Sequence, residues 1–135
     1  MITAEDYFLR MSRIAGEEPT AEIRANAAIL LERVNALLCE PVLMALPAVV
    51  DQRVNSGWRT PGYNASIANA APKSKHMSGR AIDLADPEDA LDTYLNLHRD
   101  LLEKHELWME NPIATKGWVH LQSVPPGSGN RVFLP

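Results

Sequence analysis

The most informative stretch of this sequence is SKHMSGRAID, which occupies residues 74–83. Its first part belongs to a polar loop over residues 71–78, and the alternation that follows predicts a strand over residues 80–85. Successive side chains of a strand point to opposite faces of a sheet. Asp83 therefore lies on the face opposite to its apolar neighbours, and His76 comes from the loop just before the strand.

A second strand is predicted over residues 118–122, where Val119 and Leu121 form the apolar face and His120 lies on the opposite one. If the two strands are neighbours in the sheet, Asp83 and His120 converge, and the loop histidine can reach them. Two imidazoles and one carboxylate leave a coordination position open, as in catalytic zinc sites. Spacing alone also allows the plainer alternative of a surface carboxylate and an exposed strand histidine, because the chain has neither a CxxC nor an HExxH motif.

Three motifs carry a resemblance to a known family. Residues 74–83 resemble the SxHxxGxAxD motif of zinc D-Ala-D-Ala carboxypeptidases and related peptidoglycan peptidases, which are bacterial and phage enzymes with the hedgehog/DD-peptidase fold. Residues 56–64, SGWRTPGYN, resemble the SGYR-type segment of that family, with tryptophan in place of tyrosine. Residues 118–120, WVH, resemble its closing element, so the three motifs follow the family's order over about half of the chain.

The resemblance implies roles for individual residues. His76, Asp83 and His120 would be the ligands of one Zn²⁺ per chain, the same three residues that the strand argument favours. Gly79 would permit the tight loop between the first histidine and the strand.

The resemblance also implies residues that meet the substrate. Ser74 and Trp118 would contact it, and Arg59 would face a carboxylate or carbonyl of the stem peptide, where a planar guanidinium can pair bidentately. Without the motif, a solvated loop charge would be the simpler interpretation of Arg59.

One position departs from the family pattern. These enzymes place an acidic residue, the general base, three residues before the last histidine, where this chain has Gly117. Peptide hydrolysis still needs a group that moves a proton to the leaving amine. Glu110, at the end of the strand predicted over residues 107–109, is the nearest acidic candidate, and the alternative is a solvated hairpin carboxylate.

The pattern of the whole chain predicts an α+β fold, because helices come first and strands are scattered later. The resemblance implies, more specifically, a hedgehog/DD-peptidase-like fold. In such a fold, N-terminal helices would pack on a small, mostly antiparallel sheet that carries the zinc site. The chain is expected to be a single zinc peptidase-like domain over residues 1–135. Helices are expected over residues 3–13, 20–40 and 63–70, and from Asp86-Pro87 to Leu102 with His98 packed on the apolar face. Strands are expected over residues 49–56, 80–85, 107–109 and 118–122, with an edge strand over residues 131–134.

Composition excludes several classes of protein. With 46% hydrophobic and 22% charged residues and a net charge of −4, the chain is an ordinary globular sequence without the cation excess of a nucleic-acid binder. The longest apolar run, residues 41–50, is too short to span a membrane. Residues 1–13 carry Glu5 and Asp6, and their apolar residues are spaced as in a helix, so no signal peptide is expected. The single cysteine, Cys39, excludes an internal disulfide and fits a reducing compartment.

The resemblance implies a zinc peptidase that acts on peptidoglycan stem peptides, either as a carboxypeptidase or as an endolysin-type endopeptidase, and the chain is expected to be a monomer. Synthesis in the cytoplasm and release to the cell wall by a phage or prophage would reconcile the substrate with the expected lack of a signal peptide. The alternative is a non-catalytic zinc-stabilised structural or binding module of a phage particle, since metal binding can supply folding free energy directly. A metal-free interaction domain would make the three ligands a coincidence.

Overall fold

The computed structural model describes residues 1–14 and 16–135, and it has an α+β architecture. Its five-stranded sheet has the order β1-β2-β4-β3-β5, in which β3 and β5 are parallel and the other neighbours are antiparallel. The strands are β1 (Val54–Ser56), β2 (Ala81–Ala85), β3 (Trp108–Glu110), β4 (Trp118–Gln122) and β5 (Val132–Phe133). The predicted α+β class with N-terminal helices and a mostly antiparallel sheet is confirmed.

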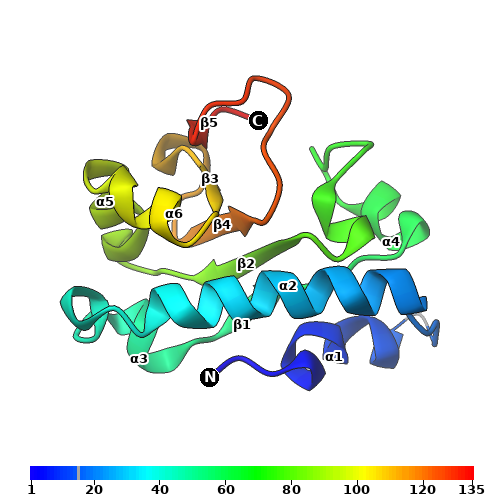
Figure 1. Ribbon diagram of the computed structural model, residues 1–135. Helices are drawn as coiled ribbons and strands as arrows, with labels where there is room; N and C mark the ends of the chain where they lie inside the picture. The colour runs from blue at the N-terminus through cyan, green and yellow to red at the C-terminus, as the bar shows by residue number, and fades with distance from the viewer. Residues whose placement is uncertain (15) are drawn as a thin grey trace.

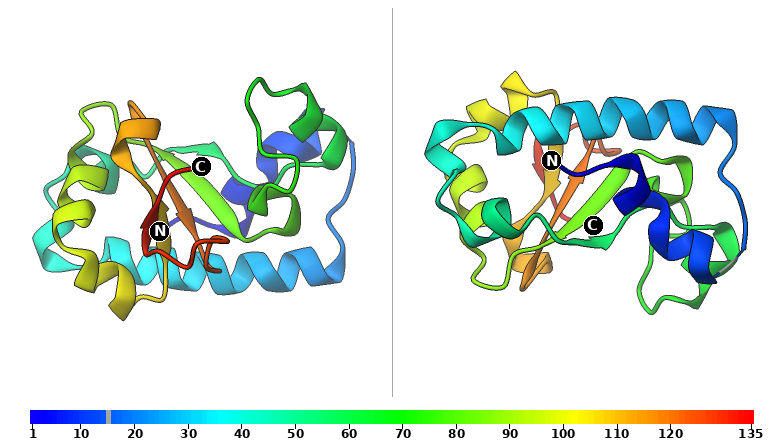
Figure 2. Two further views of the ribbon diagram at one scale, coloured as in Figure 1. Left: turned by 90° about the horizontal axis from the view of Figure 1, so that it is seen from above. Right: turned by 90° about the horizontal axis from the view of Figure 1, so that it is seen from below.

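The N-terminal helices lie on one side of the sheet, and the C-terminal segment crosses the other side (Figures 1 and 2). The helices are α1 (Ala4–Ile14), α2 (Ala21–Leu38), α3 (Pro47–Asp51), α4 (Pro61–Ser66), α5 (Ala90–Leu97) and α6 (Arg99–Lys104). Short 3₁₀ turns are η1 (Pro41–Leu43), η2 (Lys75–Ser78) and η3 (Pro112–Ala114). Within residues 1–14 and 16–135, no long helix covers the sheet face turned away from α1 and α2 where β2 and β4 meet (Figure 2).

Side-chain capping explains where the first two helices begin. Thr3 Oγ1 accepts the Asp6 N–H at 3.1 Å, and Asp6 Oδ2 in return accepts the Thr3 N–H at 2.8 Å, which is a reciprocal capping box. Thr20 Oγ1 accepts the Ile23 N–H at 3.2 Å and caps α2. Both predicted helices are confirmed.

The core forms between α2 and the apolar face of the sheet. Leu30 and Val34 of α2 are fully buried, as are Leu84 of β2 and Leu121 of β4, and all belong to one cluster. Burial of each such side chain contributes about 1.5–3 kcal/mol. This packing determines which way β2 and β4 face, and so places their polar side chains on the opposite side.

Two of the predicted elements have different bounds. The strand expected over residues 49–56 is only Val54–Ser56, because residues 47–51 form the helix α3 instead. Pro47 favours the start of this helix because its φ is already helical. Gln52 ends the helix in the left-handed region, at a φ of 47°. The helix expected over residues 63–70 begins earlier, at Pro61, because Thr60 Oγ1 accepts the Tyr63 N–H at 3.1 Å. It also ends earlier, at Ser66, because the next residue, Ile67, has an extended backbone.

The helix predicted from Asp86 to Leu102 is two helices, α5 and α6, that meet at His98. His98 has a φ of −129°, is exposed and stacks on Tyr94 with ring centroids 4.0 Å apart, so the expected apolar packing of His98 is wrong. The break allows α5 and α6 to bury separate leucines, Leu95 and Leu102. Asp86 still acts as a cap, although α5 begins at Ala90, because its carboxylate accepts three N–H groups at the start of that helix.

Asp92 is a buried carboxyl close to two other carboxylates, those of Asp86 and Asp89, and it accepts a hydrogen bond from Thr115 Oγ1 at 3.2 Å. Burial and the two negative neighbours raise the pKa of Asp92 to about 6 from an ordinary 3.8. The folded chain therefore binds this proton more tightly than the unfolded chain. Above pH 6 the ionised side chain costs the fold roughly 3 kcal/mol, and below about pH 4 that cost vanishes.

We accordingly expect Asp92→Asn to raise the free energy of unfolding at pH 7.5 by about 2–3 kcal/mol, with the gain shrinking as the pH falls from 6 to 4. The difference in the free energy of unfolding is measured by urea unfolding of the unchanged protein and of Asp92→Asn between pH 4 and pH 7.5. The exposed Asp51 supplies the control, because Asp51→Asn should change the free energy by less than about 0.5 kcal/mol. A gain that is the same at every pH would contradict the explanation.

Among residues 1–14 and 16–135, no helix has the length and apolar character that crossing a membrane requires.

Candidate metal centre

Three side chains from three elements meet on the open face of the sheet. Asp83 of β2 and His120 of β4 are register partners, and His76 reaches them from η2. Asp83 Oδ1 lies 2.8 Å from His120 Nδ1 and 3.2 Å from His76 Nε2. One possible ligand atom from each residue lies within 4.8 Å of the others, and all three residues are buried. The predicted convergence is confirmed, and the group could hold one metal ion.

The turn that delivers His76 is built locally. Ser74 Oγ caps η2 by accepting the His76 N–H at 3.3 Å. Gly79 ends the turn in the left-handed region at a φ of 77°, and a Cβ at this position would come within 2.7 Å of the Ile23 carbonyl oxygen of α2. The predicted need for glycine at 79 is confirmed, because neither the backbone conformation nor the space allows a side chain.

The hydrogen bonds of the two rings turn one nitrogen of each ring toward Asp83. His76 Nδ1 lies 2.7 Å from the Gly57 carbonyl, which can only accept, so this nitrogen carries the proton and Nε2 is left bare. His120 Nε2 lies 2.9 Å from Gln122 Oε1, which can only accept, so His120 donates from Nε2 and turns Nδ1 toward Asp83. His76 Nε2 and His120 Nδ1 thus face the same Asp83 oxygen, at 3.2 and 2.8 Å. A tetrahedral ion with 2.0–2.1 Å bonds holds its ligand atoms roughly 3.3 Å apart, so the His120–Asp83 pair would separate by about 0.5 Å to hold one.

Electrostatics favour an ionised carboxylate at the centre. Burial by itself raises the pKa of Asp83, but both histidines outweigh it and hold that pKa well below its usual range. Burial lowers the pKa of His76. Burial also opposes the charge on His120, but the hydrogen bond and charge of Asp83 overcome it and raise the pKa of His120. The centre therefore offers a negative ligand to a cation.

Arg59 lies beside this centre, and its guanidinium donates hydrogen bonds to three neighbouring side chains. Its Nη2 donates to Asp83 Oδ2 at 3.2 Å, its Nε to Ser56 Oγ at 2.9 Å, and its Nη1 to Asn64 Oδ1 at 3.4 Å. Asn64 is itself anchored, since its amide donates to the Ala71 carbonyl at 2.9 Å. The guanidinium thus occupies one oxygen of Asp83 and leaves the other to the histidines.

Glu110, at the end of β3, turns toward the centre. Its Oε2 lies 3.8 Å from His120 Nδ1, and its side chain is 13% exposed. Burial raises the pKa of Glu110, as does the charge of Asp83, while His120 and Arg59 act in the opposite direction. The carboxyl of Glu110 therefore lies beside the three ligand residues and is largely buried. It is not the solvated hairpin carboxylate of the alternative interpretation.

The residue at the family's usual acidic position has no such contact. Gly117 has a φ of 84°, its N–H donates to Asp89 Oδ1 at 2.7 Å, and a Cβ built on it would meet nothing within 4 Å. The turn before β4 therefore brings no acidic side chain to the centre, and Glu110 reaches it from the neighbouring strand.

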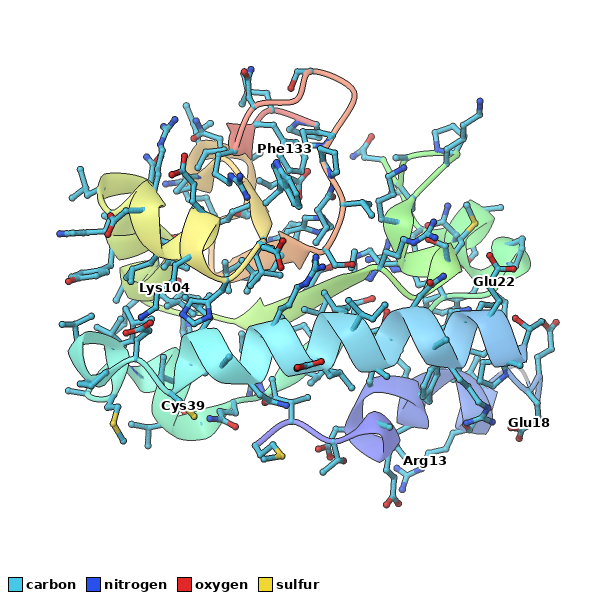
Figure 3. All side chains as sticks on the ribbon, viewed as in Figure 1. Arg13, Glu18, Glu22, Cys39, Lys104 and Phe133 are labelled. Carbon is cyan, nitrogen blue, oxygen red and sulfur yellow. The ribbon has the colours of Figure 1, made fainter. Side chains whose placement is uncertain are left out.

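The centre opens into a cavity of about 510 Å³. One side is formed by the segment between α4 and η2 and includes Ser74, and the other side includes Trp118 and Phe133. Phe133, labelled in Figure 3, lies in the C-terminal segment, and its ring centroid is 6.2 Å from that of His120. The residues predicted to contact substrate, Ser74, Arg59 and Trp118, all line this cavity.

Sequence reasoning missed three groups that organise the centre: the Gly57 carbonyl, Asn64 and Gln122. The alternation of β4 places Gln122 on the same face as His120, so this signal was available. A backbone carbonyl has no signature in the sequence, and Asn64 is brought in by the position of α4.

Comparisons with protein-family models, with curated proteins and with solved structures find no match to this chain. What the chain shows directly is an α+β fold with a buried His-Asp-His group that could hold one metal ion.

Proposed function

We propose that this protein is a zinc-dependent peptidase that hydrolyses peptidoglycan stem peptides, as a D-Ala-D-Ala carboxypeptidase or an endolysin-type endopeptidase. The observation that carries the proposal is the carboxylate of Glu110, which lies 3.8 Å from His120 Nδ1 where the cavity meets the buried triad. A ligand group alone would serve a structural metal equally well. A carboxyl beside it, outside the ligand triad and facing a cavity, is what hydrolysis requires in addition.

His76, Asp83 and His120 would hold the zinc ion, through His76 Nε2, an Asp83 oxygen and His120 Nδ1. When bound, zinc supplies a Lewis acid that polarises the scissile carbonyl and makes water more acidic. Two histidines and a carboxylate are a donor set typical of hydrolytic zinc sites. The resemblance of residues 74–83 to the SxHxxGxAxD motif supports the same three ligands.

Glu110 would move the proton in this reaction. Its carboxylate oxygen would take a proton from the attacking water and return it to the amine that leaves when the peptide C–N bond breaks. Burial raises the pKa of Glu110, which makes this carboxyl a better base than an exposed one.

Arg59, Ser74 and Trp118 would contact the peptide. All three line the cavity, and its volume of about 510 Å³ is within the range of small-molecule sites. The guanidinium of Arg59 would face a substrate carbonyl or carboxylate while it keeps its bond to Asp83. The protein would act as a monomeric single domain, and a phage or prophage that releases it at the wall would bring it to its substrate.

One observation favours a second candidate, a zinc-stabilised module without catalysis. The three donor nitrogens of Arg59 are already engaged by Asp83, Ser56 and Asn64, as in a purely structural network. A phage structural or binding protein that retains the metal for stability would need only the three ligands and this hydrogen-bond network. This candidate predicts bound zinc but no cleaved peptide.

The two candidates are separated by metal analysis combined with peptidoglycan digestion. Purified protein, with and without a chelator, is incubated with cell walls of several types, and released products are identified by mass. We expect one zinc ion per chain and product release that the chelator stops, and the product mass names the bond. Zinc without product on every wall type would support the structural module. Failure to take up zinc on reconstitution would contradict both candidates.

A further inference from the structure

Gln122 joins the candidate metal centre to the C-terminal segment. It follows His120 by two residues on β4, so both side chains project from the same face of the sheet. Gln122 is 3% exposed, and its amide makes two hydrogen bonds. Oε1 lies 2.9 Å from His120 Nε2, and Nε2 donates to the Val124 carbonyl at 2.8 Å.

These contacts determine the direction of the amide. The Val124 carbonyl can only accept a hydrogen bond, so the NH₂ group of Gln122 must face it and the amide oxygen must face the ring. An amide oxygen can only accept as well, so His120 has to donate from Nε2. The other ring nitrogen, Nδ1, lies 2.8 Å from Asp83 Oδ1, and its lone pair would become available to a metal ion that displaces the proton shared with that carboxylate.

We infer that Gln122 is a positioning residue that holds His120 in the Nε2–H tautomer and so turns Nδ1 toward the metal. The inference rests on the metal site of the proposed function and adds a residue that the motifs do not include. Gln122 itself touches no bound metal, because the imidazole ring stands between its amide and the ligand atom.

The two histidines are oriented by different kinds of group. His76 is held by the carbonyl of Gly57, and no side-chain substitution can remove that acceptor. His120 is held by a side chain whose other end is tied to Val124, just before the Pro125-Pro126 turn of the C-terminal segment. On its Nε2 side, His120 therefore depends on a single replaceable amide.

The test compares three variants for zinc affinity, measured by competition with a chromogenic chelator. Gln122→Met keeps the length of the side chain but removes the acceptor, and we expect zinc affinity to fall about 10- to 100-fold. Gln122→Glu keeps an acceptor for His120 and loses the bond to Val124, so its zinc affinity should stay close to that of the unchanged protein. The control is Gln52→Met, because Gln52 is the chain's other glutamine and lies at the turn before β1.

A spectroscopic measurement reports the tautomer itself. In the zinc-loaded, ¹⁵N-labelled protein, the Nε2–H proton of His120 should give a slowly exchanging imidazole signal. The signal should persist in Gln122→Glu and broaden or vanish in Gln122→Met. Thermal unfolding of the metal-free variants separates this effect from a general loss of structure.

The inference is overturned if Gln122→Met binds zinc as tightly as the unchanged protein. It is also overturned if Gln122→Glu loses as much affinity as Gln122→Met, because Gln122 would then matter only for packing of the C-terminal segment. Zinc binding that shows the expected pattern without peptide cleavage would contradict the peptidase and leave the role of Gln122 intact. A protein that takes up no zinc would overturn both.

Discussion

Glu110→Gln is expected to lower kcat/KM for peptidoglycan peptides by about 10²- to 10⁴-fold, the usual contribution of a positioned general acid or base. Glutamine has the same shape as glutamate but cannot take up the proton of the attacking water. The carboxyl of Glu110 lies beside the triad rather than within it, with Oε2 3.8 Å from His120 Nδ1. We therefore expect the variant to keep one zinc ion per chain.

The measurement pairs peptide hydrolysis with metal content in the same preparation. Glu103→Gln is the matched control, because Glu103 is an exposed glutamate on α6 and should affect neither quantity. Hydrolysis that remains within a few-fold of the unchanged protein would show that another group moves the proton. Loss of zinc along with activity would instead make Glu110 part of the metal site.

Asp83→Asn should have the largest effect on stability. Asp83 is 5% exposed and its carboxylate contacts Arg59, His76 and His120. Removing the negative partner leaves a guanidinium, whose side chain is 13% exposed, without its counter-charge. Breaking a buried pair in this way costs about 3–5 kcal/mol, so we expect the free energy of unfolding to fall by roughly 3 kcal/mol. The variant should also fail to retain zinc.

Unfolding is measured by urea in the presence of a chelator, because bound metal would otherwise add its own stabilisation. The double variant Asp83→Asn/Arg59→Met tests the cause, since removal of the uncompensated guanidinium should recover part of the loss. A double variant that is less stable than Asp83→Asn would show that the cost arises elsewhere, for example in the two histidines.

Much of the fold could be predicted because it is encoded in short-range patterns. The spacing of apolar residues in α2 and the threonines at 3 and 20 identify the first two helices, since capping and periodicity act over a few residues. The break at His98 could not be predicted in this way. The apolar stripe of residues 91–102 fits one helix as well as two, and the choice depends on how Leu95 and Leu102 enter the core.

The candidate site, like the fold, has a part that short-range patterns predict and a part that depends on distant segments. Alternation places Asp83 and His120 on the polar faces of their strands, and antiparallel pairing of β2 and β4 then makes them register partners. Arg59 was expected to face a substrate, and the structure also gives its Nη2 a bond to Asp83. That contact joins residues 24 positions apart and depends on where Asn64 and Ser56 hold the guanidinium.

Which side chains share a strand face could be predicted from the sequence, because strand periodicity is a local property of the backbone. Together with the resemblance of residues 74–83, this periodicity indicated the two histidines and the aspartate, and the glycine at position 117 left Glu110 as the nearest acidic candidate. The inward turn of Glu110, the contact of Gln122 with His120 and the contact of the Gly57 carbonyl with His76 became visible only in the folded chain. Each of these depends on the direction of a side chain or carbonyl within packed surroundings, which distant segments of the chain supply.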